Sequence, residues 1–220
     1  DIGALHLPRK VISSQYLVER LSLQHRLRGH RGCVNSIMFL ETLDRVLTGS
    51  DDTDLNIFDI STGEMVGHIP TIHTNNIFWA KDLPGSVGRS ILSCAADGRV
   101  IIHEDVDRET SSVGSSKVLF RHRGRAHRLD LMHGSYSCFF SCGEDGVVNL
   151  YDLRSERAVV GSTVFHRSGS KYQSSELVRG GLHTSPHRMP CYCISSSPTR
   201  PQVSSCTLER LFSSTKILSL

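Results

Sequence analysis

The fold of this chain is decided by the stretch Gly143-Glu144-Asp145-Gly146-Val147-Val148-Asn149-Leu150-Tyr151-Asp152-Leu153-Arg154. It predicts a tight turn, where Asp and Gly accept positive φ at little cost, followed by a strand rich in β-branched and aromatic residues. The same phrase occurs at residues 49–59 and, in a weaker form, at 95–104. Because one turn-and-strand unit recurs, the sequence indicates a repeat architecture.

The spacing of three kinds of residue supports the same repeat. The turn aspartates Asp52, Asp97 and Asp145 are 45 and 48 residues apart. Each aspartate follows a histidine by 22 to 24 residues and precedes an aromatic ring by six. These histidines are His30, His73 and His122, and the rings are Phe58, His103 and Tyr151. Each unit has room for four short antiparallel strands, so the sequence predicts an all-β chain.

The chain divides into three parts. We expect a lead-in over residues 1–24. It contains a short helix that follows Ser13 and Ser14, one of which caps its N-terminus. Three repeats follow over 25–160, with units at about 25–69, 73–119 and 122–164. Within the second unit we expect a polar loop from Asp107 to Ser116, and within the third a fourth strand over 158–164.

Residues 161–220 break the pattern. They are rich in Ser, lack Asp and contain seven Lys/Arg against two Asp/Glu. Such a composition buries too little apolar surface to offset the entropy of ordering, so we expect this tail to be mostly disordered. Its abrupt start leads to the hypothesis of an unrelated terminal exon. The chain begins at Asp1 rather than Met, so we also expect a fragment or a processed form.

Charge and composition exclude several classes of protein. Residues 1–160 carry 18 basic and 20 acidic residues, which gives no electrostatic case for binding nucleic acid directly. No apolar run approaches the length of a membrane span. Seven scattered Cys favour reduced thiols, and therefore an intracellular protein in the nucleus, the cytoplasm or both.

The repeats resemble the WD-repeat family, whose fold is a β-propeller with four strands per blade. The resemblance rests on Gly29-His30, on Gly49-Ser50-Asp51-Asp52 and on Phe58-Asp59, with partial copies in the later units. It implies that a hydrogen-bond network of His, Ser or Thr, Asp and an aromatic residue holds each blade. The network residues that it implies are His30, Thr48 or Ser50, Asp52, Phe58, His73, Asp97, His122 and Asp145.

A closer resemblance concerns the substrate receptors of cullin-4 ubiquitin ligases, specifically the eighth-member type of the cullin-4-associated factors. It is carried by the segments 17–21, 27–35, 93–98 and 141–145. In that family the third blade ends in Trp/Tyr-Asp-x-Arg, which stands here as Tyr151-Asp152-Leu153-Arg154. The resemblance implies that these residues face the ligase's adaptor, the damaged-DNA-binding subunit. An Arg at this place follows a rigid strand, and its planar fork binds acceptors bidentately.

Two departures weaken this transfer. The first blade ends Phe58-Asp59-Ile60-Ser61, without the Arg that the family often repeats. A propeller also needs about seven blades to close, and only three are visible in the sequence. Arg154 as a solvated rim charge therefore remains the alternative.

Other candidate sites are weaker. The blade histidines fit a structural hydrogen-bond role better than a metal site. Cys138 and Cys142, with His133 nearby, lack the second ligand pair of a zinc knuckle, as does Cys191-x-Cys193. Trp79 and Lys81 lie near the expected central opening and are candidates for touching a substrate protein, although core packing of Trp79 is the simpler interpretation.

The sequence predicts a non-catalytic interaction scaffold. No nucleophile elbow, phosphate loop or His-Glu-x-x-His motif is present, and no cofactor is implied. The partner implied by the resemblance is the ligase adaptor, together with a protein substrate that the sequence does not identify. The alternative is a generic WD-repeat scaffold of another multiprotein complex.

Overall fold

The computed structural model describes residues 15, 19–40, 44–86, 89–107, 112–132, 134–155, 159–168, 171–177, 193–196, 202–206 and 216–219. All regular structure of any length in these residues is antiparallel β-sheet. No helix of the described part is long and apolar enough to span a membrane. The predicted lead-in helix lies mostly outside the described residues. Within them, the N–H of Glu19 donates a helical hydrogen bond to the carbonyl of Gln15 at 3.0 Å.

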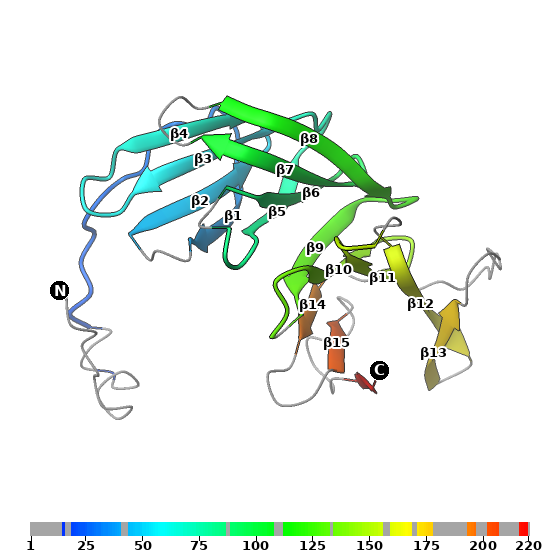
Figure 1. Ribbon diagram of the computed structural model, residues 1–220. Helices are drawn as coiled ribbons and strands as arrows, with labels where there is room; N and C mark the ends of the chain where they lie inside the picture. Colours follow the sequence, from blue (N-terminus) through cyan, green and yellow to red (C-terminus); the bar gives the residue numbers. More distant parts are fainter. Residues whose placement is uncertain are drawn as a thin grey trace.

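The first blade is a four-stranded sheet in which neighbours in sequence are neighbours in space. Its strands are β1 (Val34–Phe39), β2 (Arg45–Ser50), β3 (Asp54–Asp59) and β4 (Met65–Pro70). The second blade repeats this order with β5 (Ile77–Asp82), β6 (Ile91–Ala95), β7 (Arg99–Asp107) and β8 (Ser112–Arg121). Figure 1 shows the blades side by side as a fan.

The third blade contains β9 (Ala126–Leu131), β10 (Cys138–Gly143), β11 (Val147–Asp152) and β12 (Val159–Ser168). A fifth strand, β13 (Lys171–Leu177), pairs with the outer edge of β12. The prediction of a fourth strand over 158–164 therefore agrees with β12. This confirms an all-β chain with three propeller blades in its described part.

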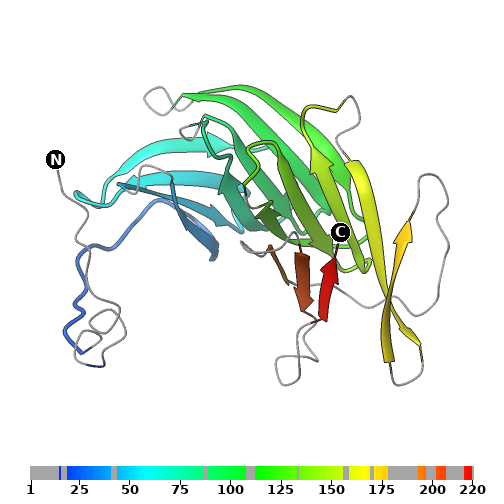
Figure 2. The same cartoon turned by 60° about the horizontal axis from the view of Figure 1, so that its bottom comes forward.

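The tail contributes strands where the composition predicts disorder. Besides β13, these are β14 (Cys193–Ser196), β15 (Gln202–Cys206) and β16 (Lys216–Ser219), which form a small sheet. Strand β14 lies against β9 and β10 of the third blade. Figure 2 shows the same fan from a second direction, with this small sheet near the third blade. The remaining residues of 161–220 lie outside the described residues, so the disorder expected for them stays a prediction.

The prediction of a polar loop from Asp107 to Ser116 is wrong. Strand β7 continues to Asp107 and β8 starts at Ser112, so the two strands form a long hairpin. Val106 and Val113 are cross-strand partners in this extension, and Val106 is buried against the first blade. This apolar pair is accompanied by polar cross-strand pairs such as Glu104–Ser115 and Asp107–Ser112.

Two apolar clusters join the three blades. The first lies between blades one and two, and its buried members include Leu47, Leu55, Ile77 and Ile91. The second lies between blades two and three and includes Leu92 and Ile102 from one side and Leu129 and Phe139 from the other. Strand β5 packs on β1 and β2, and β9 packs in the same way on β5 and β6. Stability therefore arises at the interfaces between neighbouring blades.

The first blade has one face without such a neighbour in the described structure. Ile37 lies opposite Thr48, just as Ala80 lies opposite Ser93 and Leu129 opposite Ser141. Ala80 and Leu129 are both 1% exposed, because the preceding blade covers them, whereas Ile37 is 61% exposed. Val34 and Phe39 on the same strand are also exposed. We refer to Val34, Ile37 and Phe39 as the open face of blade one.

We predict that the blade interface dominates stability. Leu55→Ala removes a fully buried side chain from the cluster between blades one and two, and should lower the free energy of unfolding by about 2 to 5 kcal/mol. Ile37→Ala, on the open face, should change it by less than about 0.5 kcal/mol. Urea unfolding followed by circular dichroism measures both. Equal losses in the two variants would contradict the assignment of the core.

Candidate functional site

Each blade is pinned by a histidine and the carboxylate of its turn aspartate. The Nδ1 atom lies 3.0 Å from the carboxylate in the pairs His30–Asp52 and His122–Asp145, and 3.2 Å in His73–Asp97. Each carboxylate also accepts the backbone N–H of the residue after the histidine, at 2.8 to 3.0 Å. One aspartate side chain thus ties together two loops that are more than 20 residues apart in sequence.

A hydroxyl continues each network on the other side of the imidazole. The Nε2 atoms of His30, His73 and His122 each lie 2.8 Å from a hydroxyl oxygen, which belongs to Thr48, Ser93 and Ser141 respectively. The sequence left Thr48 and Ser50 as alternatives. The structure brings Thr48 to His30, whereas the hydroxyl of Ser50 accepts the backbone N–H of Asp52 at 3.3 Å.

The fourth position differs from blade to blade. In blade three, the hydroxyl of Tyr151 lies 2.8 Å from that of Ser141. In blade two, Nε2 of His103 lies 2.9 Å from the Ser93 hydroxyl, and Nδ1 of His103 lies 2.8 Å from the Ser116 hydroxyl. In blade one, Phe58 is buried but has no polar atom, and the Thr48 hydroxyl donates instead to the backbone carbonyl of Asn56 at 3.2 Å.

Counting donors and acceptors gives the blade-two network a direction. A carboxylate only accepts, so Nδ1 of His73 donates to Asp97, and in the tautomer with Nε2 unprotonated this atom accepts from Ser93. The Ser93 oxygen then accepts the Nε2–H of His103, whose Nδ1 accepts from Ser116. His103 stands where the repeat pattern has a tryptophan. It therefore supplies the ring N–H donor that the tryptophan would supply. The sequence pattern implied no network role for His103, Ser93 or Ser141.

Burial and hydrogen bonding set the charge states of these groups. Burial raises the pKa of Asp97, but the hydrogen bonds from His73, Thr74 and Arg99 outweigh it and lower the pKa to about 2. The same balance lowers the pKa values of Asp52 and Asp145. Burial lowers the pKa of His103 to about 4, with a further contribution from His73. The network thus consists of neutral His103 and anionic aspartates at neutral pH.

The turn after β11 holds Arg154 at a fixed place. Its Nε donates to Oδ1 of Asp152 at 2.9 Å and its Nη2 to Oδ2 at 2.8 Å, and its backbone N–H donates to Oδ1 at 3.0 Å. The side-chain hydrogen bond from Arg154 is the largest cause that lowers the pKa of Asp152 to about 2. The Arg154 side chain is nevertheless 73% exposed. Its guanidinium is oriented from within the chain and presented to solvent.

The other residues of the predicted adaptor motif lie deeper. Tyr151 is fully buried, where its ring stacks on Phe139 with centroids 4.4 Å apart. Leu153 packs at the edge of the cluster between blades two and three. In this structure Tyr151 and Leu153 therefore position the turn, and Arg154 is the part of the motif that a partner can reach.

The corresponding turn of blade one is closed differently. Oδ1 of Asp59 accepts the backbone N–H of Ser61 at 2.8 Å and that of Thr62 at 3.1 Å. A serine thus occupies the place of the arginine. In blade two the strand β7 continues through Glu104 to Asp107, so this position has no turn at all.

The remaining sequence candidates take structural roles. Lys81 donates to Asp130 at 2.8 Å, and the guanidinium of Arg128 lies 3.8 Å above the ring of Trp79. Both contacts join β5 to β9 rather than point to a ligand. Cys142 is buried and Cys138 half-buried, while His133 and Cys191 lie outside the described residues. No group of three metal-ligating side chains occurs in the described part of the chain.

Comparison with known proteins identifies the class of fold. Residues 21–59 match the family model described as WD domain, G-beta repeat. A crystal structure of the WD40 beta propeller domain of Doa1 superposes with a TM-score of 0.58 and covers 88% of this chain and 56% of that chain. At 20% sequence identity, this similarity bears on the fold alone. The described repeats are WD40 β-propeller blades.

Similarity in sequence to curated proteins is higher than to this solved structure. The chain is 33% identical to human DDB1- and CUL4-associated factor 6 over 148 residues, which are 67% of this chain and 17% of the relative. It is 33% identical to mouse WD and tetratricopeptide repeats protein 1 over 152 residues, or 69% and 22%. The fission yeast WD repeat protein iqw1 is 28% identical over 201 residues, or 89% and 23%. The chain therefore spans about a fifth of the length of these relatives.

We predict that His103 makes the fold acid-sensitive. Its folded pKa of about 4 lies below the usual histidine pKa of 6.5, so the unfolded chain binds the proton more readily. The stabilisation is complete above pH 6.5 and is lost as the pH falls towards 4, a total of roughly 3 kcal/mol. His103→Gln keeps an N–H donor without this titration and should flatten the dependence. Urea unfolding at a series of pH values measures it.

The matched control is His25→Gln, which removes an exposed imidazole and leaves His103 in place. This variant should keep the parent's loss of stability on acidification. If His103→Gln and the parent lost stability in parallel between pH 6.5 and 4, His103 would not be the responsible group.

Proposed function

We propose that this chain is a substrate-receptor portion of a cullin-4 RING ubiquitin ligase and that Arg154 contacts the DDB1 adaptor. The observation that carries the proposal is the Arg154 turn, in which a guanidinium is oriented by Asp152 and exposed to solvent. Similarity to DDB1- and CUL4-associated factor 6 supports it. The finer assignment to the eighth-member type of these factors stays a prediction.

The geometry of the turn fits recognition of a protein acceptor. Nε and Nη2 of Arg154 are engaged by Asp152, which leaves Nη1 of this exposed side chain without a described partner. Because the side chain is already ordered, docking costs less rotamer entropy than ordering a free arginine would. A backbone carbonyl or carboxylate of the adaptor is the expected acceptor.

In this proposal the chain itself performs no catalysis. The ligase's other subunits supply the ubiquitin-transfer chemistry, and the chain contributes binding surfaces without a cofactor. Its expected place is the nucleus, the cytoplasm or both, where such ligases work.

The second candidate is a generic WD-repeat scaffold of another complex. It is favoured by relatives such as WD and tetratricopeptide repeats protein 1, whose name refers to repeats and not to a ligase. In that case Arg154 is a solvated rim charge held by Asp152.

We predict that Arg154→Ala weakens binding to purified DDB1 at least tenfold, which is about 1.5 kcal/mol, the contribution of a charge-assisted hydrogen bond. Arg154→Lys should lose most of the same affinity because a lysine cannot form the fork with Asp152. Isothermal titration calorimetry on the full chain gives the dissociation constants, and circular dichroism verifies that each variant is folded.

The matched control is Arg89→Ala. Arg89 is another exposed arginine paired with an aspartate, at 3.6 Å from Asp105, in the β5–β6 loop on the same side of the fan as Arg154. Its loss should leave adaptor binding within about twofold, since it lies outside the Arg154 turn. A folded parent that does not bind DDB1 would refute the receptor role and leave the generic scaffold as the better account.

A further inference from the structure

The last residue of β8 and the turn between β8 and β9, which we together call the arginine turn, carry arginines at alternate positions. Arg121, Arg123 and Arg125 are exposed, while His122 between them is buried in the blade-three network. This turn lies beside the β10–β11 turn, at the end of the strands opposite to the Arg154 turn. None of the functions discussed above uses it.

The backbone of this turn is fixed on every side. The N–H of His122 donates to the carbonyl of Gly98 at 2.8 Å, and that of Arg123 donates to Asp145 at 3.0 Å. The N–H of Glu144 donates to the carbonyl of Arg125 at 2.9 Å. The arginines therefore start from fixed backbone positions, which reduces the entropy lost on binding.

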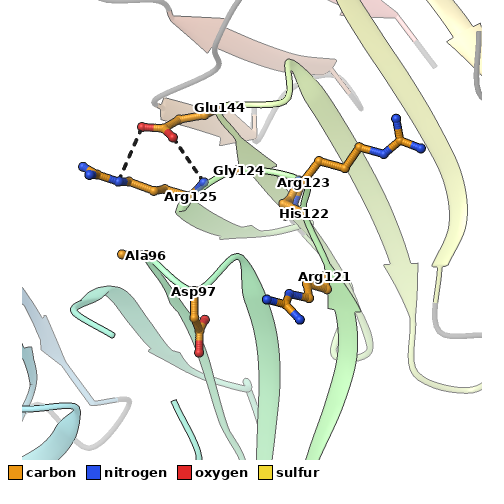
Figure 3. A pocket seen from close by; sticks show the side chains of 8 residues that line it. All are labelled: Ala96, Asp97, Arg121, His122, Arg123, Gly124, Arg125 and Glu144. Atoms are coloured by element: carbon orange, nitrogen blue, oxygen red, sulfur yellow. Dashed lines mark hydrogen bonds and ion pairs between the residues drawn. The ribbon is translucent and has the colours of Figure 1, made fainter. Parts of the chain in front are cut away.

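The three arginines are among the residues that line an open hollow between the second and third blades, and Figure 3 shows their side chains extending in different directions. Its floor includes the β6–β7 turn, where Gly98 has φ +77° and an added Cβ would lie 2.6 Å from the carbonyl oxygens of His122 and Gly124. The hollow is lined by Ala96, Asp97, Arg121, His122, Arg123, Gly124, Arg125 and Glu144.

The charges of this hollow do not cancel. Asp97 is committed to His73 and is almost completely buried. Glu144 lies 3.2 Å from His127 and 4.0 Å from the Arg125 guanidinium. Arg121 and Arg123 have no acidic partner among the described residues. Two guanidinium groups are thus free to bind an anion, and Arg125 is only loosely engaged.

The arrangement favours an extended ligand over a single ion. In Figure 3 the Arg121 guanidinium lies near Asp97, and the Arg125 side chain lies near Glu144. The Arg123 side chain extends away from all of these residues. Three separated guanidinium groups match negative charges spaced along a chain. The hollow has no aromatic side chain among its lining residues except the imidazole of the buried His122, so it offers no platform on which bases would stack.

We infer that this arginine turn binds a short acidic peptide segment, with carboxylate or phosphate groups spaced along it, of a partner protein. The inference deepens the receptor function proposed above and rests on it, because such a segment would belong to the substrate. The Arg154 turn and the arginine turn lie at opposite ends of the same blade, so adaptor and substrate are bound without competing.

The test is fluorescence-anisotropy binding of the full chain to labelled peptides in the absence of any adaptor. One peptide carries alternating glutamates, one carries phosphoserines at those positions, and one carries glutamines. The two charged peptides should bind, more weakly as salt rises from about 50 to about 200 mM, and the glutamine peptide should not. The stronger of the two charged peptides identifies the source of the negative charge.

The decisive variant is Arg121→Ala/Arg123→Ala, which should weaken both charged peptides by about tenfold or more, as loss of charge-assisted hydrogen bonds does. Its urea midpoint should equal that of the parent, because both side chains are exposed. Arg89→Ala is the matched control and should bind as the parent does.

Unchanged peptide affinity in the double variant, or equal binding of the glutamine peptide, would overturn the inference. So would displacement of the charged peptides by a single-stranded oligonucleotide at lower concentration than by unlabelled peptide. Arg154→Ala should keep peptide binding while it loses DDB1. If the parent chain binds the charged peptides but not DDB1, the receptor proposal has failed. If it binds DDB1 but not the peptides, the peptide inference has failed.

Discussion

The hydrogen bond between one buried histidine and one turn carboxylate helps to position both exposed arginine-bearing turns of blade three. In blade three the pair His122–Asp145 stands at one end of the strands, and Ser141 carries the network inward to Tyr151 on β11. Tyr151 precedes Asp152, which orients Arg154 at the opposite end. Hydrogen bonds from His122 to Tyr151, followed by the backbone of β11, thus connect the arginine turn to the Arg154 turn. Loss of His122 would loosen both surfaces, because His122 lines the hollow beside the arginines and also supports Tyr151 through Ser141.

The fourth position shows how the fold tolerates the loss of its usual indole donor. Tyr151 replaces the donor with a phenol, His103 replaces it with an imidazole N–H, and Phe58 only fills the space. The replacement in blade one depends on a close approach of the preceding segment: a Cβ at Gly29 would lie 3.2 Å from Cζ of Phe58. The backbone at Gly29 thus packs closely against the Phe58 ring. The third strand keeps the same pairing with the second strand in all three blades, with Asn56, Ile101 and Asn149 opposite Thr48, Ser93 and Ser141.

Sequence periodicity located the blades and the histidine–aspartate pairs because both recur at nearly constant spacing. The hydroxyl partner was also within reach: Thr48, Ser93 and Ser141 all stand four residues before the turn aspartate. Three features were not accessible in this way. His103 looks like a lost aromatic until its two neighbouring hydroxyls are known. The β7–β8 extension depends on a single apolar pair within a polar segment. The burial of Tyr151 depends on packing against β9 and β10. The motif Tyr151-Asp152-Leu153-Arg154 predicts only that Tyr151 faces the adaptor.

The open face of blade one has a consequence for how the molecule fluctuates. Blade two is held on both sides by apolar clusters, but Ile37 and Val34 are uncovered, so blade one is held on one side only. In an array whose stability arises between neighbours, the blade with a single interface opens at the lower free energy. The amide protons of β1 to β4 should therefore exchange with solvent before those of β5 to β7. Any surface that covers Ile37 would slow that exchange first, which makes blade one the natural reporter of whatever completes the array.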